Sequence, residues 1–490
     1  MLFEPLFAHA DKAGQETAII DDHGRYTYQQ LAAMAAGLGM YLAAQTNRPR
    51  VGLLLPASAG FAASFYGTLL AGKSVVPINF LLTEREIGHI ISDSGIDTVV
   101  TIPFLAGRLK DTPLKVVDLT QLPKTPPAAI VPKFPSVKAD DEAVLLYTSG
   151  TSGLPKGVIL TYGNFQSDVD SAIEHAIFQA KHKFLGVIPL FHSFGITAMM
   201  LAPIQLGATI IYLARFSAVG TLNAIKEHQV SLMFGVPSMY AAIAHLKSAK
   251  PEDFKSVYAA ISGAEPLPAT VREALLKRFE LPLYEGYGLT ETSPVIALNT
   301  PKENRPGSVG KPVPGAEFRI ADQDSGQPLP AGQIGEIWVR GPMVMKGYHN
   351  LSKETAEALT ADGFFKTGDL GRFDNDGFLY ITGRKKDMII IAGEKAYPRE
   401  IEDILAKHPC VAEAAVIGKK DPARGEVIVA FVVPKEGHVE ACKPDDLRDF
   451  CRQQGLVNWK IPREIKVVQD FPRSPTGKVL KRQLAEQAGG

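Results

Sequence analysis

The sequence contains little cysteine and shows no excess of either charge. Its 490 residues include three cysteines, which cannot all pair with one another. That count is typical of a protein from a reducing compartment and excludes a disulfide framework. Lys and Arg number 52, as do Asp and Glu, so no overall basic field attracts nucleic acid or anionic lipid. We therefore expect a cytoplasmic protein without a nucleic-acid partner.

Unbroken hydrophobic runs are also missing. The uncharged stretches Val51–Gly72 and Phe184–Ala214 are long enough to cross a bilayer. Both contain proline and glycine, however, and are better explained as buried strands and helices separated by turns. The first residues lack the basic segment of a signal peptide and include Glu4. We therefore expect no transmembrane segment.

Short apolar runs rich in β-branched residues alternate with helical patterns over most of the chain. Helical periodicity over 27–43, for example, precedes the apolar run 51–55. Such alternation predicts parallel sheets with helices on both faces. After Arg305, short strands punctuated by Gly and Pro predict a mostly β subdomain. Charge density rises after Gly383, where a compact α/β pattern begins, and we place a domain boundary there.

The strongest local signal is LLYTSGTSGLPKG, residues 145–157. Glycines let backbone N–H groups wrap an anion, hydroxyls donate further hydrogen bonds and a lysine adds positive charge. The composition therefore predicts a phosphate cradle, although the Walker A spacing is absent. The alternative is a flexible surface loop, which rarely combines so many donors with a buried strand. The residues of the predicted phosphate loop are Thr148, Ser149, Gly150, Thr151, Ser152, Gly153 and Lys156.

A second signal is YEGYGLTETSP, residues 284–294. Tyr287 is suited to stack on a base. Glu291 supplies a hard oxygen ligand for Mg²⁺, which binds through one or two carboxylates and substrate phosphates. Considered alone, the segment is explained equally well as a structural Gly-rich turn.

Three further segments are weak when each is considered alone. Asp369 in FFKTGDL is placed to accept hydrogen bonds from ribose hydroxyls, although an Asx-turn is the commoner explanation. The charged run GRKKD and the turn at Gly393 indicate either a hinge or a solvated face. Lys478 follows a Pro/Gly-rich loop, where an ordinary tail lysine is the commoner explanation.

These five motifs, in this order and spacing, resemble the adenylate-forming superfamily. That superfamily includes acyl-CoA synthetases, adenylation domains of peptide synthetases and beetle luciferases. The resemblance covers nearly the whole chain. It implies an α/β fold with a large N-terminal domain, residues 1–385, made of two parallel α/β sheets and a β subdomain. A small mobile α/β C-terminal domain, residues 386–490, would follow.

The resemblance also implies roles for individual residues. Those matched to the nucleotide site are Gly263, Ala264 and Glu265 beside the adenine, Tyr287 stacked on it, Thr290 at the phosphates, Glu291 as the Mg²⁺ ligand, and Asp369 with Arg384 at the ribose.

Four more residues match positions at the hinge, the pantetheine tunnel, the adenylation step and the acyl pocket. Lys386 falls at the hinge, Gly393 at the glycine beside the pantetheine tunnel, and Lys478 at the lysine that stabilises adenylation. His192 matches a histidine at the mouth of the acyl pocket. Considered alone, His192 would more often be a core histidine with satisfied hydrogen bonds.

The implied reaction uses ATP, Mg²⁺ and coenzyme A as co-substrate. A carboxylate attacks the α-phosphate and releases pyrophosphate, and a thiol then attacks the acyl-adenylate and releases AMP. Segments matched to the acyl pocket, such as FHSFGITAMM and MFGVPSMYAAI, are apolar. An amino acid would need an acidic partner for its ammonium group. We therefore expect a medium- or long-chain fatty acid.

Several alternatives stay open at this stage. A separate acyl carrier protein is the alternative acceptor, and an aryl or arylpropanoid acid is the alternative substrate. A luciferase-like oxygenase shares the first half-reaction. A catalytically inactive binding protein is disfavoured, because Glu291, Asp369, Arg384 and Lys478 occur together.

Overall fold

The computed structural model describes residues 1–110, 112–122, 134–148, 154–422, 424–473 and 479–489. Its contacts divide the chain into two units. The first unit comprises Met1–Leu267, Ala274–Glu317 and Val339–Phe365, and the second comprises Pro268–Glu273, Phe318–Trp338 and Lys366–Gly490. The chain thus passes between the units more than once. A boundary between 385 and 386 stays a prediction.

One sheet of the first unit has the strand order β18-β8-β7-β4-β3-β5-β6. The strands from β7 to β6 run parallel, whereas β8 and β18 are antiparallel to their neighbours. Apart from its first residue, β3 is fully buried, as expected for a strand covered on both faces. The strands are β3 (Arg50–Leu54), β4 (Ser74–Pro77), β5 (Thr98–Thr101), β6 (Lys115–Asp118), β7 (Glu142–Thr148), β8 (Lys156–Thr161) and β18 (Gly347–Tyr348).

The other sheet of this unit has the order β15-β14-β13-β12-β11-β9-β10-β1-β2. Its central strands, from β13 to β1, run parallel, and antiparallel strands close both ends. The strands are β1 (Thr17–Asp21), β2 (Gly24–Thr27), β9 (Lys183–Gly186), β10 (Thr209–Tyr212), β11 (Leu232–Gly235), β12 (Ala259–Ser262), β13 (Leu283–Gly288), β14 (Val295–Leu298) and β15 (Lys311–Pro312).

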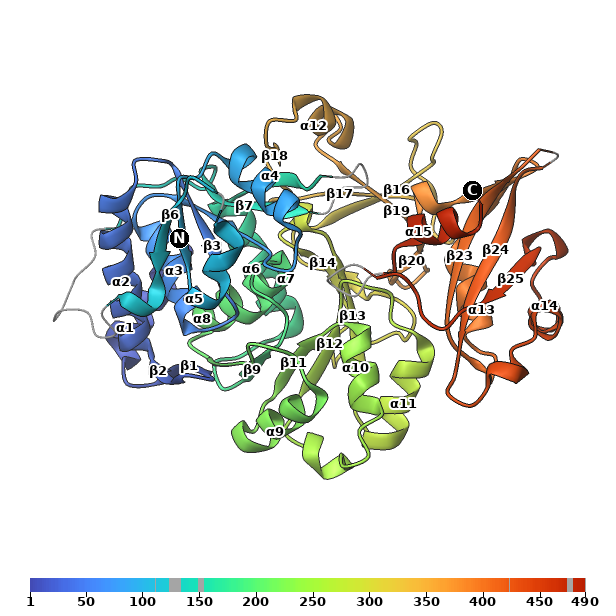
Figure 1. Ribbon diagram of the computed structural model, residues 1–490, viewed down its shortest axis with the longest axis horizontal. Helices are drawn as coiled ribbons and strands as arrows, with labels where there is room; N and C mark the ends of the chain where they lie inside the picture. Colours follow the sequence, from blue (N-terminus) through green and yellow to red (C-terminus); the bar gives the residue numbers. More distant parts are fainter. Residues whose placement is uncertain (111, 123–133, 149–153, 423, 474–478, 490) are drawn as a thin grey trace. The chain divides into compact units, whose positions relative to one another are not determined.

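Several helices of the first unit begin at a side chain that accepts a hydrogen bond from an N–H group of the first turn. Capping boxes pair Thr27 with Gln30, Thr83 with Glu86, and Thr161 with Asn164. Helices α2 and α3 pack side by side in the N-terminal, blue part of the chain (Figure 1). The helices are α1 (Glu4–Ala13), α2 (Tyr28–Gln45), α3 (Ala59–Leu70), α4 (Glu84–Ser94), α5 (Pro103–Ala106), α6 (Tyr162–Ala176), α7 (Ser193–Ile196), α8 (Ala202–Leu206), α9 (Ala218–His228), α10 (Pro237–Ala244), α11 (Ala269–Phe279, partly in the second unit) and α12 (Ser352–Ala358).

The uncharged stretches fold as core strands and helices. Val51–Gly72 forms most of β3, a turn and α3. Phe184–Ala214 begins at the second residue of β9 and continues through α7, α8 and β10. Between α7 and α8 the chain makes a π-helical turn at Thr197–Leu201, which the sequence pattern did not reveal. No helix within the described ranges is long and apolar enough to cross a membrane.

The second unit contains two sheets among its described residues. One has the order β16-β17-β19-β20, and the other β22-β21-β24-β23 with β25 paired to β24. The strands are β16 (Glu317–Ala321), β17 (Gly335–Arg340), β19 (Phe365–Phe373), β20 (Leu379–Arg384), β21 (Ile389–Ile391), β22 (Glu394–Ala396), β23 (Val411–Asp421), β24 (Gly425–Pro434) and β25 (Glu464–Val467). The helices are α13 (Pro398–Leu405), α14 (Pro444–Gln453) and α15 (Lys481–Gln487).

The predicted fold class is confirmed: a large N-terminal part with parallel sheets is followed by a small C-terminal domain. Mobility of the small domain stays a prediction.

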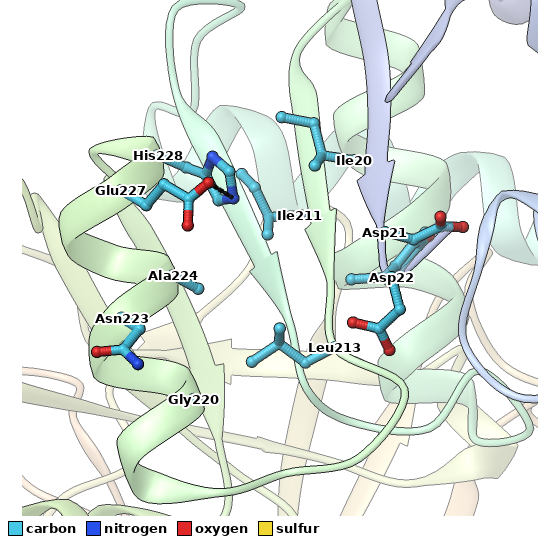
Figure 2. A pocket seen from close by; sticks show the side chains of 11 residues that line it. Ile20, Asp21, Asp22, Ile211, Leu213, Gly220, Asn223, Ala224, Glu227 and His228 are labelled. Carbon is cyan, nitrogen blue, oxygen red and sulfur yellow. Dashed lines mark ion pairs between the residues drawn. The ribbon is translucent and has the colours of Figure 1, made fainter. Parts of the chain in front are cut away.

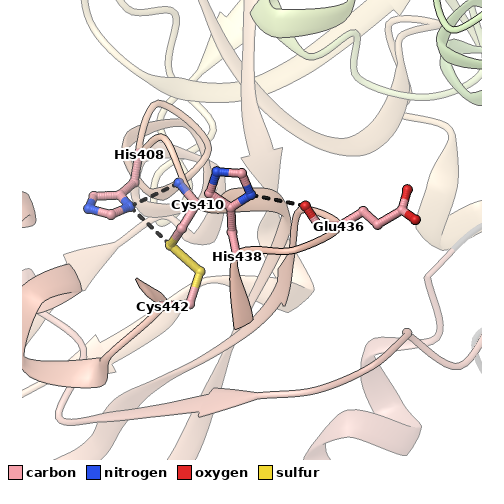
Figure 3. Close-up of a disulfide and its surroundings, with 5 residues drawn as sticks. All are labelled: His408, Cys410, Glu436, His438 and Cys442. Atoms are coloured by element: carbon pink, nitrogen blue, oxygen red, sulfur yellow. Dashed lines mark hydrogen bonds between the residues drawn. A yellow bond between two sulfur atoms is a disulfide. The ribbon is translucent and has the colours of Figure 1, made fainter. Parts of the chain in front are cut away.

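The structure corrects the expectation drawn from the cysteine count. Cys410 and Cys442 form a disulfide (Figure 3), and Cys451 is free and buried. Three cysteines exclude complete pairing but still allow one bond, which the sequence argument overlooked. His408 Nδ1 lies 3.1 Å from Cys410 Sγ and accepts a hydrogen bond from the Cys410 N–H. The disulfide belongs to the core cluster between β24, α13 and α14.

Candidate active site

The two described ends of the predicted phosphate loop lie opposite each other. Thr148 is the last residue of β7 and Lys156 is the first of β8, and the two are register partners in an antiparallel pair. Both are partly buried. Ser149, Gly150, Thr151, Ser152 and Gly153 lie outside the described residues.

Glu291 lies in a short 3₁₀ turn, Thr290–Thr292, after β13. The Tyr348 hydroxyl donates a hydrogen bond to Glu291 Oε1 at 2.9 Å. The backbone of Glu291 is also fixed, because its carbonyl accepts the Met345 N–H at 2.8 Å. The ammonium of Lys156 lies 5.6 Å from the centre of the Tyr348 ring. One tyrosine therefore contacts both a phosphate-loop residue and the predicted metal ligand.

The predicted adenine segments lie at adjacent strand ends. Ser262 of β12 is the register partner of Glu285 of β13, so Gly263, which follows β12, and Tyr287, near the end of β13, lie at the ends of neighbouring parallel strands. Ligands of α/β sheets bind at such carboxyl ends. Ala264 has a φ of 67°, a backbone conformation uncommon for a residue with a side chain.

Gly263 also approaches the predicted acyl segment closely. A Cβ atom at Gly263 would lie 3.2 Å from the Phe194 ring, so only glycine leaves that ring in place. His192 is partly buried two residues before Phe194, and its ring lies 4.8 Å from the Phe191 ring. The π-helical turn follows at once, and such turns are frequent at functional sites.

The predicted ribose pair is brought together within the second unit. Asp369 of β19 and Arg384 of β20 are register partners, and Arg384 Nε lies 3.0 Å from Asp369 Oδ1. The Asp369 side chain is 6% exposed, whereas that of Arg384 is 50% exposed. A buried carboxylate is thus fixed at the sheet edge by a cation that reaches solvent.

Gly393 occupies a tight hairpin between β21 and β22. Ala392 and Gly393 have φ values of 49° and 90°, the positive pair that a two-residue type I′ turn requires. Among the described residues no atom lies within 4 Å of a Cβ placed on Gly393, and the positive φ of the turn is what favours glycine there. Lys386 lies in the turn Lys385–Asp387 between the two sheets of this unit. Lys478 lies outside the described residues.

Comparison with known proteins identifies the family. Residues 6–349 match the AMP-binding enzyme family, and residues 400–478 match the AMP-binding enzyme C-terminal domain. The chain belongs to the AMP-binding enzymes.

Named relatives of this AMP-binding enzyme include ligases for different acids. A long-chain-fatty-acid–CoA ligase of Bacillus subtilis is 34% identical over 517 residues, which cover 96% of this chain and 92% of the relative. A feruloyl-CoA synthase of Amycolatopsis sp. is 34% identical over 485 residues, covering 96% of each. The solved structure of o-succinylbenzoate coenzyme A synthetase from Bacillus subtilis, in complex with ATP and magnesium ion, superposes with a TM-score of 0.88 at 30% identity and covers 98% of both chains.

Sequence reasoning missed three side chains that hold this AMP-binding enzyme's motifs in place. Tyr348 is the first. Asn164 Nδ2 donates to the carbonyls of Pro342 and Val344, both at 2.8 Å. Glu336, whose side chain is 7% exposed, pairs with Lys385 at 2.9 Å. The sequence could have pointed to Glu336, because it is a charged residue in an apolar strand pattern. No sequence pattern pointed to Tyr348 or Asn164.

A cavity lies apart from these motifs, at the ends of β1 and β10 beside α9 (Figure 2). Asp21, Asp22, Glu227 and His228 contribute its polar groups. Asp21 already accepts the N–H groups of His23 at 2.8 Å and Ala59 at 2.9 Å, so it caps local backbone. The Asp21 carboxylate is therefore explained by the local fold.

Proposed function

We propose that this protein is an ATP-dependent carboxylic acid–CoA ligase that forms an acyl-adenylate and then an acyl thioester. The observation that carries the proposal is the contact of Tyr348 with both Lys156 and Glu291, which gathers a phosphate-loop cation and a carboxylate at one place. Membership of the AMP-binding enzymes and the CoA-ligase names of the relatives support the same reaction.

The donor set around Glu291 fits Mg²⁺. That ion takes one or two protein carboxylates and completes its shell with water and phosphate oxygens. In the part of the chain that the structure describes, no three His, Cys, Asp or Glu side chains gather as a metal cage. A single carboxylate with a fixed orientation is what a nucleotide-bound Mg²⁺ needs, and the ion would neutralise phosphate charge when bound.

The protein's own residues have separable tasks in the first half-reaction. Lys156 and Thr148 would hold the phosphates, Tyr287 the base, and the Asp369–Arg384 pair the ribose hydroxyls. Adenylation concentrates negative charge on the α-phosphate, so preorganised cations and donors lower the barrier. Lys478 would supply a further charge at this step.

The second half-reaction would use coenzyme A. Its thiol attacks the anhydride carbonyl, and AMP leaves. A rotation of the small domain about Lys386 would exchange Lys478 for the Gly393 turn near the reacting carbonyl, in keeping with hinge motions that serve two-step reactions. A separate acyl carrier protein is the second candidate acceptor.

We propose a medium- or long-chain fatty acid as substrate. The segments assigned to the acyl group are apolar, and Ile196, Met199, Met200 and Phe234 are all buried. An aryl acid is the second candidate, because the Amycolatopsis relative is named a feruloyl-CoA synthase.

The test is pyrophosphate release across a panel of acids, with coenzyme A, with a carrier protein, or with neither. For saturated acids kcat/KM should rise about fourfold per added methylene until the pocket is full, since each buried CH₂ contributes about 0.8 kcal/mol. A preference for ferulate-like acids would replace the fatty-acid proposal. Absence of acid-dependent pyrophosphate release with any acid would overturn the ligase itself.

A further inference from the structure

Tyr348 lies on a ribbon, residues 341–350, that connects two distant motifs. On one side β18 pairs with β8, with Tyr348 opposite Val158. The Lys346 N–H donates to Ile159 at 3.1 Å, and the His349 N–H donates to Gly157 at 2.8 Å. The ribbon is thus fixed to the strand that leaves the phosphate loop.

The other side of the ribbon is fixed to the Glu291 turn. The Met345 N–H donates to the Glu291 carbonyl at 2.8 Å, and Ser293 Oγ donates to the Met343 carbonyl at 2.9 Å. Asn164 holds two further carbonyls of the ribbon from α6. With both edges bonded, the backbone that carries Tyr348 has little freedom to shift relative to Glu291.

The side chain of Tyr348 has one hydroxyl hydrogen to give, and it gives it to Glu291 Oε1. A carboxylate that accepts such a bond is restricted to one orientation before any ligand arrives.

We propose that Tyr348 is a positioning residue that orients the Glu291 carboxylate toward a nucleotide-bound divalent cation. The inference rests on the proposed function, in which Glu291 is the metal ligand. Partners that hold a metal ligand typically change metal affinity by 10- to 100-fold when removed. Tyr348 would act through Glu291 and would not touch the nucleotide.

The decisive variant is Tyr348→Phe, which removes the hydroxyl and keeps the ring under Lys156. ATP binding is measured by calorimetry without any carboxylic acid, once with EDTA and once over a range of Mg²⁺ concentrations. In Tyr348→Phe we expect the Mg²⁺ concentration that gives half of the maximal increase in ATP affinity to rise at least about tenfold over wild type. The ATP Kd measured in EDTA should change by less than about twofold. Tyr28→Phe is the matched control, because its buried hydroxyl donates to the Ala208 carbonyl at 2.8 Å, remote in sequence from these motifs.

A double-mutant cycle with Glu291→Gln separates positioning from a general loss of packing. If Tyr348 acts through Glu291, adding Tyr348→Phe to Glu291→Gln should leave the Mg²⁺ midpoint unchanged. Equal weakening of ATP binding with and without Mg²⁺, or full additivity in the cycle, would overturn the positioning role. If the ATP affinity of the wild-type protein does not depend on Mg²⁺, the assignment of Glu291 as metal ligand is wrong, and so is the inference about Tyr348.

Discussion

Breaking the Cys410–Cys442 disulfide should lower the free energy of unfolding of the second unit by about 4 kcal/mol. The two cysteines are 32 residues apart in the sequence. A crosslink of that span removes about 12 cal/mol/K of entropy from the unfolded chain, or about 3.7 kcal/mol at 25 °C. Both cysteines are nearly fully buried in one core cluster, so the folded unit keeps its packing while the unfolded chain gains freedom.

Tryptophan fluorescence can follow this unit selectively. The chain has two tryptophans; Trp338 and Trp459 both belong to the second unit, and Trp459 packs against the cluster that holds the disulfide. Trp338→Phe would leave Trp459 as the only reporter. With a urea slope of about 2 kcal/mol/M, the unfolding midpoint should fall by about 2 M when a reductant is present throughout.

Two variants control the measurement. Cys451→Ala should keep the response to reductant, because Cys451 is the free cysteine. The double variant Cys410→Ala/Cys442→Ala should be insensitive to reductant. A wild-type midpoint that moves by less than about 0.5 M would refute the reasoning, as would alkylation of all three cysteines in native protein that has seen no reductant.

Three further predictions concern single side chains. Asp369→Ala should raise the KM for ATP at least about tenfold in steady-state assays, with a smaller effect on kcat, because ribose contacts form before and during the reaction. Burial raises the pKa of Asp168 well above its ordinary value, so wild type should lose stability relative to Asp168→Asn as pH rises, and urea midpoints at pH 5 and pH 8 will show whether the difference grows. Lys478→Ala should slow adenylation about 10²–10³-fold in pyrophosphate assays yet still convert supplied acyl-adenylate to thioester, whereas Gly393→Leu should do the reverse.

Each of these has a contrary outcome. An unchanged KM for ATP would remove Asp369 from the ribose site. A stability difference at Asp168 that is constant with pH would mean that its carboxyl is charged in the folded state. Equal damage to both half-reactions by Lys478→Ala and Gly393→Leu would remove the two-orientation mechanism.

Local patterns in the sequence predicted much of the fold. The helical period over 27–43 became α2, whose start is set by the adjacent Thr27–Gln30 capping box. Likewise, Asp369 and Arg384 could be matched because short motifs carry them, and their hairpin makes them register partners.

Features that depend on distant pairing were missed. Tyr348 meets Lys156 and Glu291 only because β18 pairs with β8, a strand nearly two hundred residues earlier. Nothing in the spacing of GYHN indicates that pairing. The disulfide was missed for the same reason, because tertiary packing decides which cysteines pair. The number of cysteines gives only an upper limit on the number of disulfides.

The repeated passage of the chain between the two units has a consequence for its synthesis. β17 ends at Arg340, and its sheet neighbour β19 begins at Phe365. At about 5–20 residues per second, the ribosome needs roughly 1–5 s to make the intervening segment. All of that segment, including β18 and α12, belongs to the first unit. Until β19 follows, the nascent chain carries an unpaired edge of β17, and such an edge invites pairing with another chain.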